Sequence, residues 1–322
     1  MAKPVSLPEE LLSPFAWDRY LQQLEFDYYN VTATQQWAVT MWPWIFASSF
    51  LYVTLCFLGV RYMKDRERFR LRRTLVLWNA GLAAYSVYAL SRMIPGFVLD
   101  VKEGRWSHMI CSSQYFYDIG PWSFLFPLSK VFEFGDTVFV VLKKKKLIFL
   151  HWYHHITVLW FCWYSLVYPI GPGRMFSTVN LFVHSVMYTY YGIVASGLVR
   201  LPRSVNICVT TLQLAQMFIG LYVNVYAYYK VYTGGACDMH VSHFVLSTTM
   251  YLSYMILFAN YFYMTYINKR PAVPVSSEKK NGLSDAADAA LSNGSSGHAA
   301  NGRNGINANG HHATTVHHVK AE

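Results

Sequence analysis

The feature that most constrains this chain is a series of seven long apolar segments, because a helix that crosses a membrane needs about 20 mainly apolar residues. Hydrophobic residues make up 54% of the sequence and charged residues 14%. The breaks between segments are short and carry turn residues or charge, such as Pro95-Gly96 and the lysines at 143–146. The sequence therefore predicts an all-α polytopic membrane protein with seven transmembrane helices, at about 38–60, 74–94, 117–142, 147–168, 175–198, 205–229 and 243–267.

Lysine and arginine in the short loops predict the orientation, because cytoplasmic loops carry an excess of both. The loops after the first, third and fifth segments hold thirteen of these residues, against four in the loops on the other side. We therefore expect the lysine-rich loops and the C-terminus to face the cytosol and the N-terminus to face the lumen. The net charge of +10 fits loops at an anionic membrane face, and no basic stretch carries a nucleic-acid motif.

Both ends of the chain differ from the apolar region. Residues 1–37 are predicted to form a short lumenal segment, and they lack the basic stretch and apolar run of a cleaved signal peptide. In residues 268–322 small and polar residues dominate, and such a composition cannot bury enough surface to fold. The sequence thus predicts a transmembrane domain at 38–267 and a disordered cytosolic tail at 268–322.

Ionisable residues in the third segment are notable because each one inside a membrane span is costly and is therefore a functional hypothesis. Lys130, Glu133 and Thr137 follow at i, i+3 and i+7, which predicts one helical face, with Asp136 beside it. A buried cation near two carboxylates can be mutually compensated. The segment carries either a structural ion network or a set of groups that support a nearby active site.

Three histidines, His151, His154 and His155, open the fourth segment. Their i, i+3, i+4 spacing places them on one helical face. One buried histidine is usually a satisfied core residue, whereas three on one face at a helix start are typical of a site that binds metal or performs acid–base or nucleophilic chemistry.

Two further polar stripes follow at helical spacing in the fifth and sixth segments. Under the predicted orientation, these stripes, the histidines and the charged residues of the third segment lie in the cytosolic half of the membrane or near its middle. We therefore expect them to meet in one cavity that opens toward the cytosol. The stripes consist of Asn180, His184, Tyr188 and Tyr191 in the fifth segment and Gln213 and Gln216 in the sixth.

At these residues the sequence resembles the ELO family, the very-long-chain fatty acid elongases of the endoplasmic reticulum. The motifs KVFEFGDT, HWYHH, NLFVHSVMYTYY and TTLQLAQ carry the resemblance. Their order and spacing are similar to those of the family from about residue 40 to residue 267. A lone HxxHH is a weak signal, but four motifs in order are a strong one.

The resemblance implies a seven-helix bundle around a narrow acyl tunnel and the condensing step that begins microsomal fatty acid elongation. In that step a 3-oxoacyl-CoA synthase, an acyltransferase, joins acyl-CoA and malonyl-CoA and releases carbon dioxide and CoA. No metal or redox cofactor is implied. The expected partners are acyl-CoA, malonyl-CoA, membrane lipid, the ketoreductase, dehydratase and enoyl reductase of the cycle and a second copy of the chain, with no nucleic acid.

We assign the nucleophile of that reaction to a histidine, because Cys162 and Cys208 lie outside the polar motifs. The hypothesis is that His154 attacks the acyl thioester and holds an acyl-imidazole. His184 and His155 would orient groups or transfer protons, and His151 completes the catalytic set.

Polar neighbours have supporting roles in this hypothesis. Asp136 or Glu133 would set the tautomer of a histidine. Gln213 and Asn180 would donate hydrogen bonds to the thioester or to the malonyl carboxylate. The HWYHH variant is similar to members that act on saturated and monounsaturated chains near sixteen carbons, although some relatives with it take polyunsaturated chains.

Two alternatives from other classes remain. A membrane di-iron desaturase or hydroxylase also uses an HxxHH box, but it needs about eight histidines, and His108, His240 and His243 fall on the lumenal side under the predicted orientation. A transporter or receptor would line a substrate path with polar residues, and repeat symmetry or paired half-helices would support it. Neither is visible in the sequence.

The lumenal loops give two more expectations. Cys111 and Cys237 follow the second and sixth segments, and disulfides persist in the oxidising lumen, so these two either pair or remain as free thiols. Asn30-Val-Thr32 and Asn293-Gly-Ser295 both match the glycosylation acceptor pattern. Only Asn30 is expected to be modified, because Asn293 lies in the predicted cytosolic tail.

Overall fold

The computed structural model describes residues 29–268, which form helices joined by short connections, without a strand. Most of the predicted N-terminal segment and of the predicted tail, Asn293 included, lies outside the described residues. The helices are α2 (Val31–Thr40), α3 (Trp42–Met63), α4 (Arg72–Lys102), α5 (Trp106–Cys111), α6 (Tyr115–Asp118), α7 (Trp122–Phe132), α8 (Gly135–Leu142), α9 (Phe149–Val167), α10 (Gly173–Ser196), α11 (Arg203–Tyr232), α12 (Val241–Phe262) and the π-helical turn η2 (Tyr263–Ile267).

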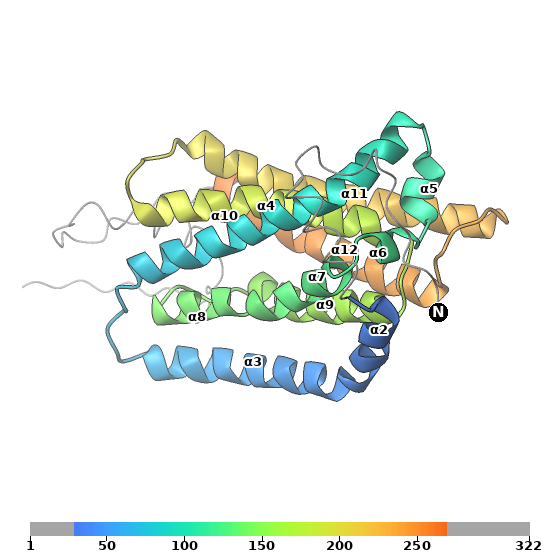
Figure 1. Cartoon of the computed structure of the whole chain (residues 1–322). Helices are drawn as coiled ribbons and strands as arrows, with labels where there is room; N and C mark the ends of the chain where they lie inside the picture. Colours follow the sequence, from blue (N-terminus) through green and yellow to red (C-terminus); the bar gives the residue numbers. More distant parts are fainter. Residues whose placement is uncertain (1–28, 269–322) are drawn as a thin grey trace, which may run out of the picture.

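Six helices, whose axes run along the length of the molecule (Figure 1), form a closed ring through their contacts. α4 packs against α10, α10 against α11, α11 against α12, α12 against α9, α9 against α7, and α7 returns to α4. α3 lies at the edge of the molecule and packs against α8 and α9. The expected bundle is therefore a ring of six helices with α3 outside it.

Four helical stretches of the described region are long and apolar enough to cross a membrane: α3, α4, α11, and α12 together with η2. α9 and α10 have similar lengths, 19 and 24 residues, but they carry many of the polar residues of the predicted site. The all-α polytopic membrane class is confirmed, whereas the number of seven spans stays a prediction.

The third predicted segment is not one helix but three, α6, α7 and α8. Between α7 and α8 the backbone N–H groups of Phe134, Asp136 and Thr137 each donate to the carbonyl three residues earlier. Such 3₁₀ turns take three residues instead of 3.6, so they rotate the side chains that follow. Lys130 and Glu133 share one face as predicted and form an ion pair, but the prediction that Thr137 shares this face is wrong: Glu133 and Asp136 line a cavity between the helices, and Thr137 does not.

The predicted break at Pro95-Gly96 is also wrong, because α4 continues through both residues to Lys102. Proline removes one helical hydrogen bond, which membrane helices tolerate when neighbouring groups compensate. Gly96 leaves room for the guanidinium of Arg174, which a Cβ atom would meet. The additional turns of α4 place Asp100 where its carboxylate pairs with Arg174 of α10.

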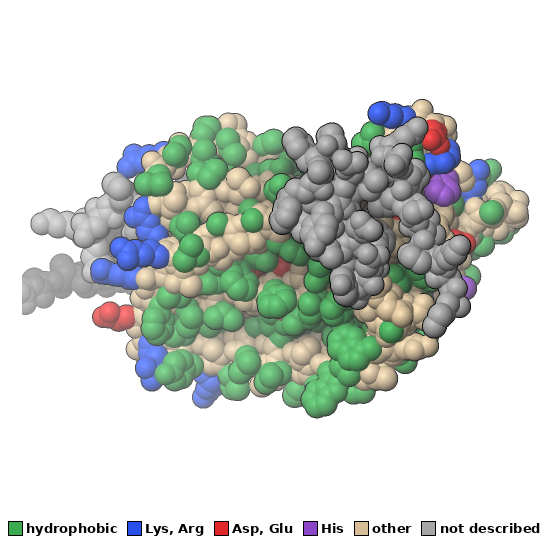
Figure 2. Space-filling model, in the orientation of Figure 1, with side chains coloured by type: hydrophobic (Ala, Val, Ile, Leu, Met, Phe, Trp, Pro, Cys, Tyr) green, Lys and Arg blue, Asp and Glu red, His purple; other side chains and the backbone are tan. Residues whose placement is uncertain are grey.

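The two ends of the bundle differ in charge. Lysine and arginine gather at the end where α3 stops, α4 begins and the α8–α9 turn lies (Figures 1 and 2). This turn falls at the four lysines, as predicted, and Lys144 within it adopts a positive φ of 54°. We call this end the lysine-rich end.

The opposite end is tied together by covalent and ionic contacts. Cys111 and Cys237 form a disulfide, with their Cα atoms 4.3 Å apart. The carboxylate of Asp238 accepts hydrogen bonds from the backbone N–H and the hydroxyl of Ser113, at 2.8 and 2.7 Å. Asp100, 1% exposed, lies near this end and anchors its own set of ion pairs. These contacts join α4, α5 and α10 to the segment that precedes α12.

Candidate active site

The predicted site residues converge on one cavity inside the ring, with a volume of about 230 Å³. We call it the central cavity. It reaches the lysine-rich end, where Lys143, Lys145 and Lys146 contribute to its wall. Eleven of the thirteen predicted catalytic and supporting residues line it, and Lys130 and Thr137 are the exceptions. The eleven are Glu133, Asp136, His151, His154, His155, Asn180, His184, Tyr188, Tyr191, Gln213 and Gln216.

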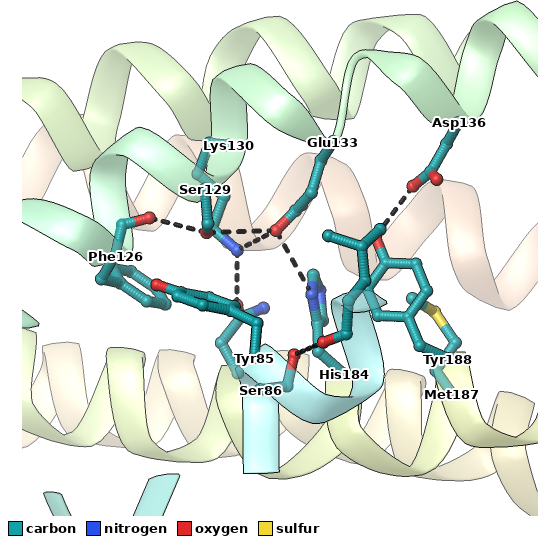
Figure 3. A network of polar contacts seen from close by, with 12 residues as sticks. Tyr85, Ser86, Phe126, Ser129, Lys130, Glu133, Asp136, His184, Met187 and Tyr188 are labelled. Atoms are coloured by element: carbon teal, nitrogen blue, oxygen red, sulfur yellow. Dashed lines mark hydrogen bonds and ion pairs between the residues drawn. The ribbon is translucent and has the colours of Figure 1, made fainter. Parts of the chain in front are cut away.

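A buried ion network joins α7 to α10 (Figure 3). The Lys130 ammonium donates to Glu133 Oε1 at 2.7 Å and to Asn180 Oδ1 at 2.9 Å. Glu133 Oε1 also lies 3.5 Å from His184 Nδ1. The Lys130 and Glu133 side chains are 1% and 3% exposed, so each charge is compensated by the other rather than by water.

This network fixes the orientation of two side chains that face the central cavity. An ammonium group only donates, so its partner on Asn180 is the amide oxygen, and the amide NH₂ remains as a donor for another group. A carboxylate only accepts, so His184 presents Nδ1–H to Glu133 and keeps Nε2 as its acceptor nitrogen. Of the two carboxylates proposed to set a histidine tautomer, Glu133 is the one beside a histidine.

Asp136 has different partners. Trp78 of α4 donates its indole N–H to Asp136 Oδ1 at 2.7 Å, and the Tyr188 hydroxyl donates to Oδ2 at 2.8 Å. A Cβ atom at Gly135 would collide with the Trp78 ring, so glycine is needed there for Trp78 to approach. Asp136 therefore connects α4, α8 and α10 and holds Tyr188 in the wall of the central cavity.

Thr137 links the first histidine of the motif to α3. Its hydroxyl contacts His151 Nε2 at 2.9 Å and the Tyr52 hydroxyl at 2.6 Å. The Tyr52 ring stacks on Phe134, with the ring centroids 4.1 Å apart. Sequence reasoning missed Tyr52 and Trp78, because a single aromatic residue in an apolar span gives no periodic signal.

The remaining two histidines have few polar contacts. His155 packs edge-on against the His151 ring at 4.7 Å, and its buried Nδ1 has no hydrogen-bond partner among the described residues. His154 packs against the Tyr254 ring at 4.8 Å, and the Tyr254 hydroxyl donates to its backbone carbonyl at 3.2 Å. Within residues 29–268, the side-chain hydrogen bonds to His154 end on its backbone carbonyl, which leaves its ring nitrogens available for chemistry.

A second, mainly apolar cavity continues from the first and has a volume of about 70 Å³. We call it the apolar cavity. The two cavities share four wall residues: His154, Asn180, Gln216 and Met217. His154 thus lies where a polar space meets an apolar one. Other walls of the apolar cavity include Met93, Phe116, Trp122, Cys162, Phe176 and Tyr251.

The three histidines predicted to lie on the lumenal side do not join this site. His108 contacts Asp100 at 3.1 Å, and His240 and His243 lie at the start of α12. These three residues line neither the central nor the apolar cavity. In the described part of the chain, no three histidine, cysteine or acidic side chains are grouped so that they could hold a metal ion.

Several known proteins are similar to this chain in sequence. The family model described as the GNS1/SUR4 family, ELO, matches residues 37–273. Very long chain fatty acid elongase 6 of Drosophila melanogaster is 40% identical over 253 residues, which cover 77% of this chain and 79% of the relative. The proteins of the same name from Gallus gallus and Homo sapiens are each 39% identical over 254 residues, covering 77% of this chain and 94% of theirs. The chain therefore belongs to the ELO family and is a multi-pass membrane protein of fatty acid elongation.

Proposed function

We propose that this protein catalyses the condensation of acyl-CoA with malonyl-CoA, as a very-long-chain 3-oxoacyl-CoA synthase. The observation that supports it is the position of His154, at the junction of the central and apolar cavities. An acyl chain in the apolar cavity and a CoA group toward the lysine-rich end would bring the thioester carbonyl to this histidine. No other site histidine lines both cavities.

In the first half-reaction the His154 imidazole attacks the thioester carbonyl. A nitrogen–carbon bond forms, the carbon–sulfur bond breaks, and the imidazole proton leaves with the thiolate as free CoA. In the second half-reaction malonyl-CoA loses carbon dioxide, and the resulting carbanion attacks the acyl carbon. The nitrogen–carbon bond breaks, 3-oxoacyl-CoA forms, and the released imidazolate takes up one proton.

The neighbouring side chains would assist both steps. The amide NH₂ of Asn180, oriented by Lys130, is a donor for the oxygen on which negative charge develops. Gln216 lines both cavities and can donate to the same region. His184, oriented by Glu133, is a proton carrier through Nε2. His151 and His155 complete the histidine wall of the central cavity.

Substrate and cellular setting belong to the same proposal. We infer saturated or monounsaturated chains near sixteen carbons as substrates and no resident cofactor. The lysine-rich end would face the cytosol, where CoA esters are found, and the disulfide end would face the lumen of the endoplasmic reticulum. There the chain would supply its product to the ketoreductase, dehydratase and enoyl reductase of the cycle, as a monomer or as a homodimer.

The test is to trap the acylated protein. Purified full-length chain is incubated with palmitoyl-CoA without malonyl-CoA, and intact and peptide mass spectrometry locates the added acyl group. We expect acylation at His154, its loss in His154→Ala, and ping-pong kinetics in the complete reaction. Cys162→Ala is the matched control, because Cys162 also lines the apolar cavity. Near-normal condensation in His154→Ala together with its loss in Cys162→Ala would refute the assignment.

A further inference from the structure

A third cavity lies outside the ring, between the end of α3 and the α8–α9 turn. Its volume is about 680 Å³, within the roughly 300–1,000 Å³ range of small-molecule sites. We call it the outer pocket. Five of its wall residues are basic and none is acidic. The basic residues are Arg61, Lys64, Lys144, Lys145 and Lys146.

The walls of the outer pocket are held in place by contacts between its two sides. The Lys144 ammonium donates to the backbone carbonyls of Lys64 and Arg66, at 2.9 Å in both cases. The N–H of Phe69 donates to the carbonyl of Leu142 at 3.0 Å. The positive φ of Lys144 occurs in the same turn as these contacts. The α3–α4 loop is thereby fixed against the α8–α9 turn.

The rest of the wall is apolar, and two of its four residues face outward. Phe57 and Val60 belong to α3, a candidate membrane span, and they are 53% and 43% exposed. In a membrane such side chains contact lipid tails, whereas the basic residues at the end of α3 lie at the level of the headgroups. The acidic residues of the adjacent loop, Asp65 and Glu67, do not line the pocket.

We propose that the outer pocket binds an anionic membrane phospholipid, with its phosphate near Arg61 and Lys64 and the start of its tails along Phe57 and Val60. A zwitterionic lipid carries a compensating cation that the five basic residues repel. A soluble phosphate gains the ionic contacts but none of the apolar burial. This site is separate from the proposed condensation, although Lys145 and Lys146 also line the central cavity.

The test uses full-length protein in vesicles that contain a phosphatidylglycerol with a photoactivatable group near the start of one tail. Mass spectrometry locates the labelled peptides. We expect labelling at residues 57–64 and 141–146, and at least fivefold less from the equivalent phosphatidylcholine probe. Millimolar 3′,5′-ADP, which matches the nucleotide end of CoA, should leave the labelling unchanged. Equal labelling by phosphatidylcholine, or displacement by 3′,5′-ADP, would overturn the proposal.

A pair of charge-neutral variants provides the second arm. Arg61→Gln with Lys64→Gln should raise the amount of phosphatidylglycerol needed for half-maximal labelling about 25-fold, at about fivefold per charge. Arg70→Gln with Arg73→Gln is the matched control, because these exposed residues carry the same charge near the same end but do not line the pocket. An equal change in both pairs would mean general surface attraction and would also overturn the proposal. The lipid-labelling and 3′,5′-ADP experiments on the unaltered protein test the proposal even if a variant fails to fold.

Discussion

Replacing Lys130 by methionine should strongly destabilise the protein while the matching change at Glu133 restores part of the loss. Lys130 and Glu133 are almost fully buried and 2.7 Å apart. Lys130→Met leaves the carboxylate without its cation inside the bundle, and breaking a buried pair in this way costs about 3–5 kcal/mol. For a domain of this size, about 1 kcal/mol lowers Tm by about 2–4 °C, so we expect a loss of roughly 6–20 °C.

The double variant Lys130→Met with Glu133→Gln removes both charges. Its Tm should lie above that of the less stable single variant, because neither charge is left buried alone. Its condensing activity should stay low, since His184 loses the carboxylate that orients it and Asn180 loses the ammonium that fixes its amide. The double variant therefore separates the stabilising role of the network from its role in the site.

Tryptophan fluorescence during heating in detergent micelles measures these Tm values, and condensation of labelled malonyl-CoA measures activity. Lys102→Met is the control, because Lys102 is exposed at the end of α4 and the change should shift Tm by no more than about 2 °C. The reasoning fails if Lys130→Met melts within the range of this control. It also fails if the losses of the two single variants simply add in the double variant.

Three further predictions concern the surroundings of the site. Tyr52→Phe removes the hydroxyl that contacts Thr137, so kcat should fall about two- to tenfold with an unchanged KM in steady-state assays, and a normal kcat would contradict this role. Cys111→Ser and Cys237→Ser should lower Tm equally, by the equivalent of about 2–5 kcal/mol, and the double variant should melt no lower than either single one. Phe116→Ala enlarges the apolar cavity, so gas chromatography should show products two or more carbons longer than those of the unaltered protein; an unchanged product profile would mean that Phe116 does not limit chain length.

The convergence of the site could be predicted because helical spacing is a local property. His151, His154 and His155 lie in α9, where the period of 3.6 residues holds, and all three line the central cavity as expected. The same period also places Asn180 and His184 on the inner face of α10. These predictions needed only that each helix be regular over the residues concerned.

The rest could not be predicted because it depends on packing between distant segments. The 3₁₀ turns before Thr137 accompany the stacking of Phe134 on Tyr52, which lies more than 80 residues earlier. α4 passes Pro95 and thereby carries Asp100 to its ion pair with Arg174. In both places the local sequence pattern predicted a different course of the backbone, and contacts with another helix accompany the course that the structure shows.

The geometry of the cavities bears on the order of the proposed reaction. The central cavity is a space of about 230 Å³ that meets the apolar cavity at His154. Under the proposed reaction, acyl-CoA and malonyl-CoA must use this space in turn. The acyl group then has to stay behind while CoA is exchanged, and a covalent bond to a residue at the inner end of the cavity achieves this. His184 and His151 are each held by a polar neighbour, whereas His154 lies beside the apolar cavity with no hydrogen bond to its ring from residues 29–268. The position between the two cavities and the imidazole without a hydrogen bond from the described residues therefore both favour His154 as the acyl carrier of the proposed reaction.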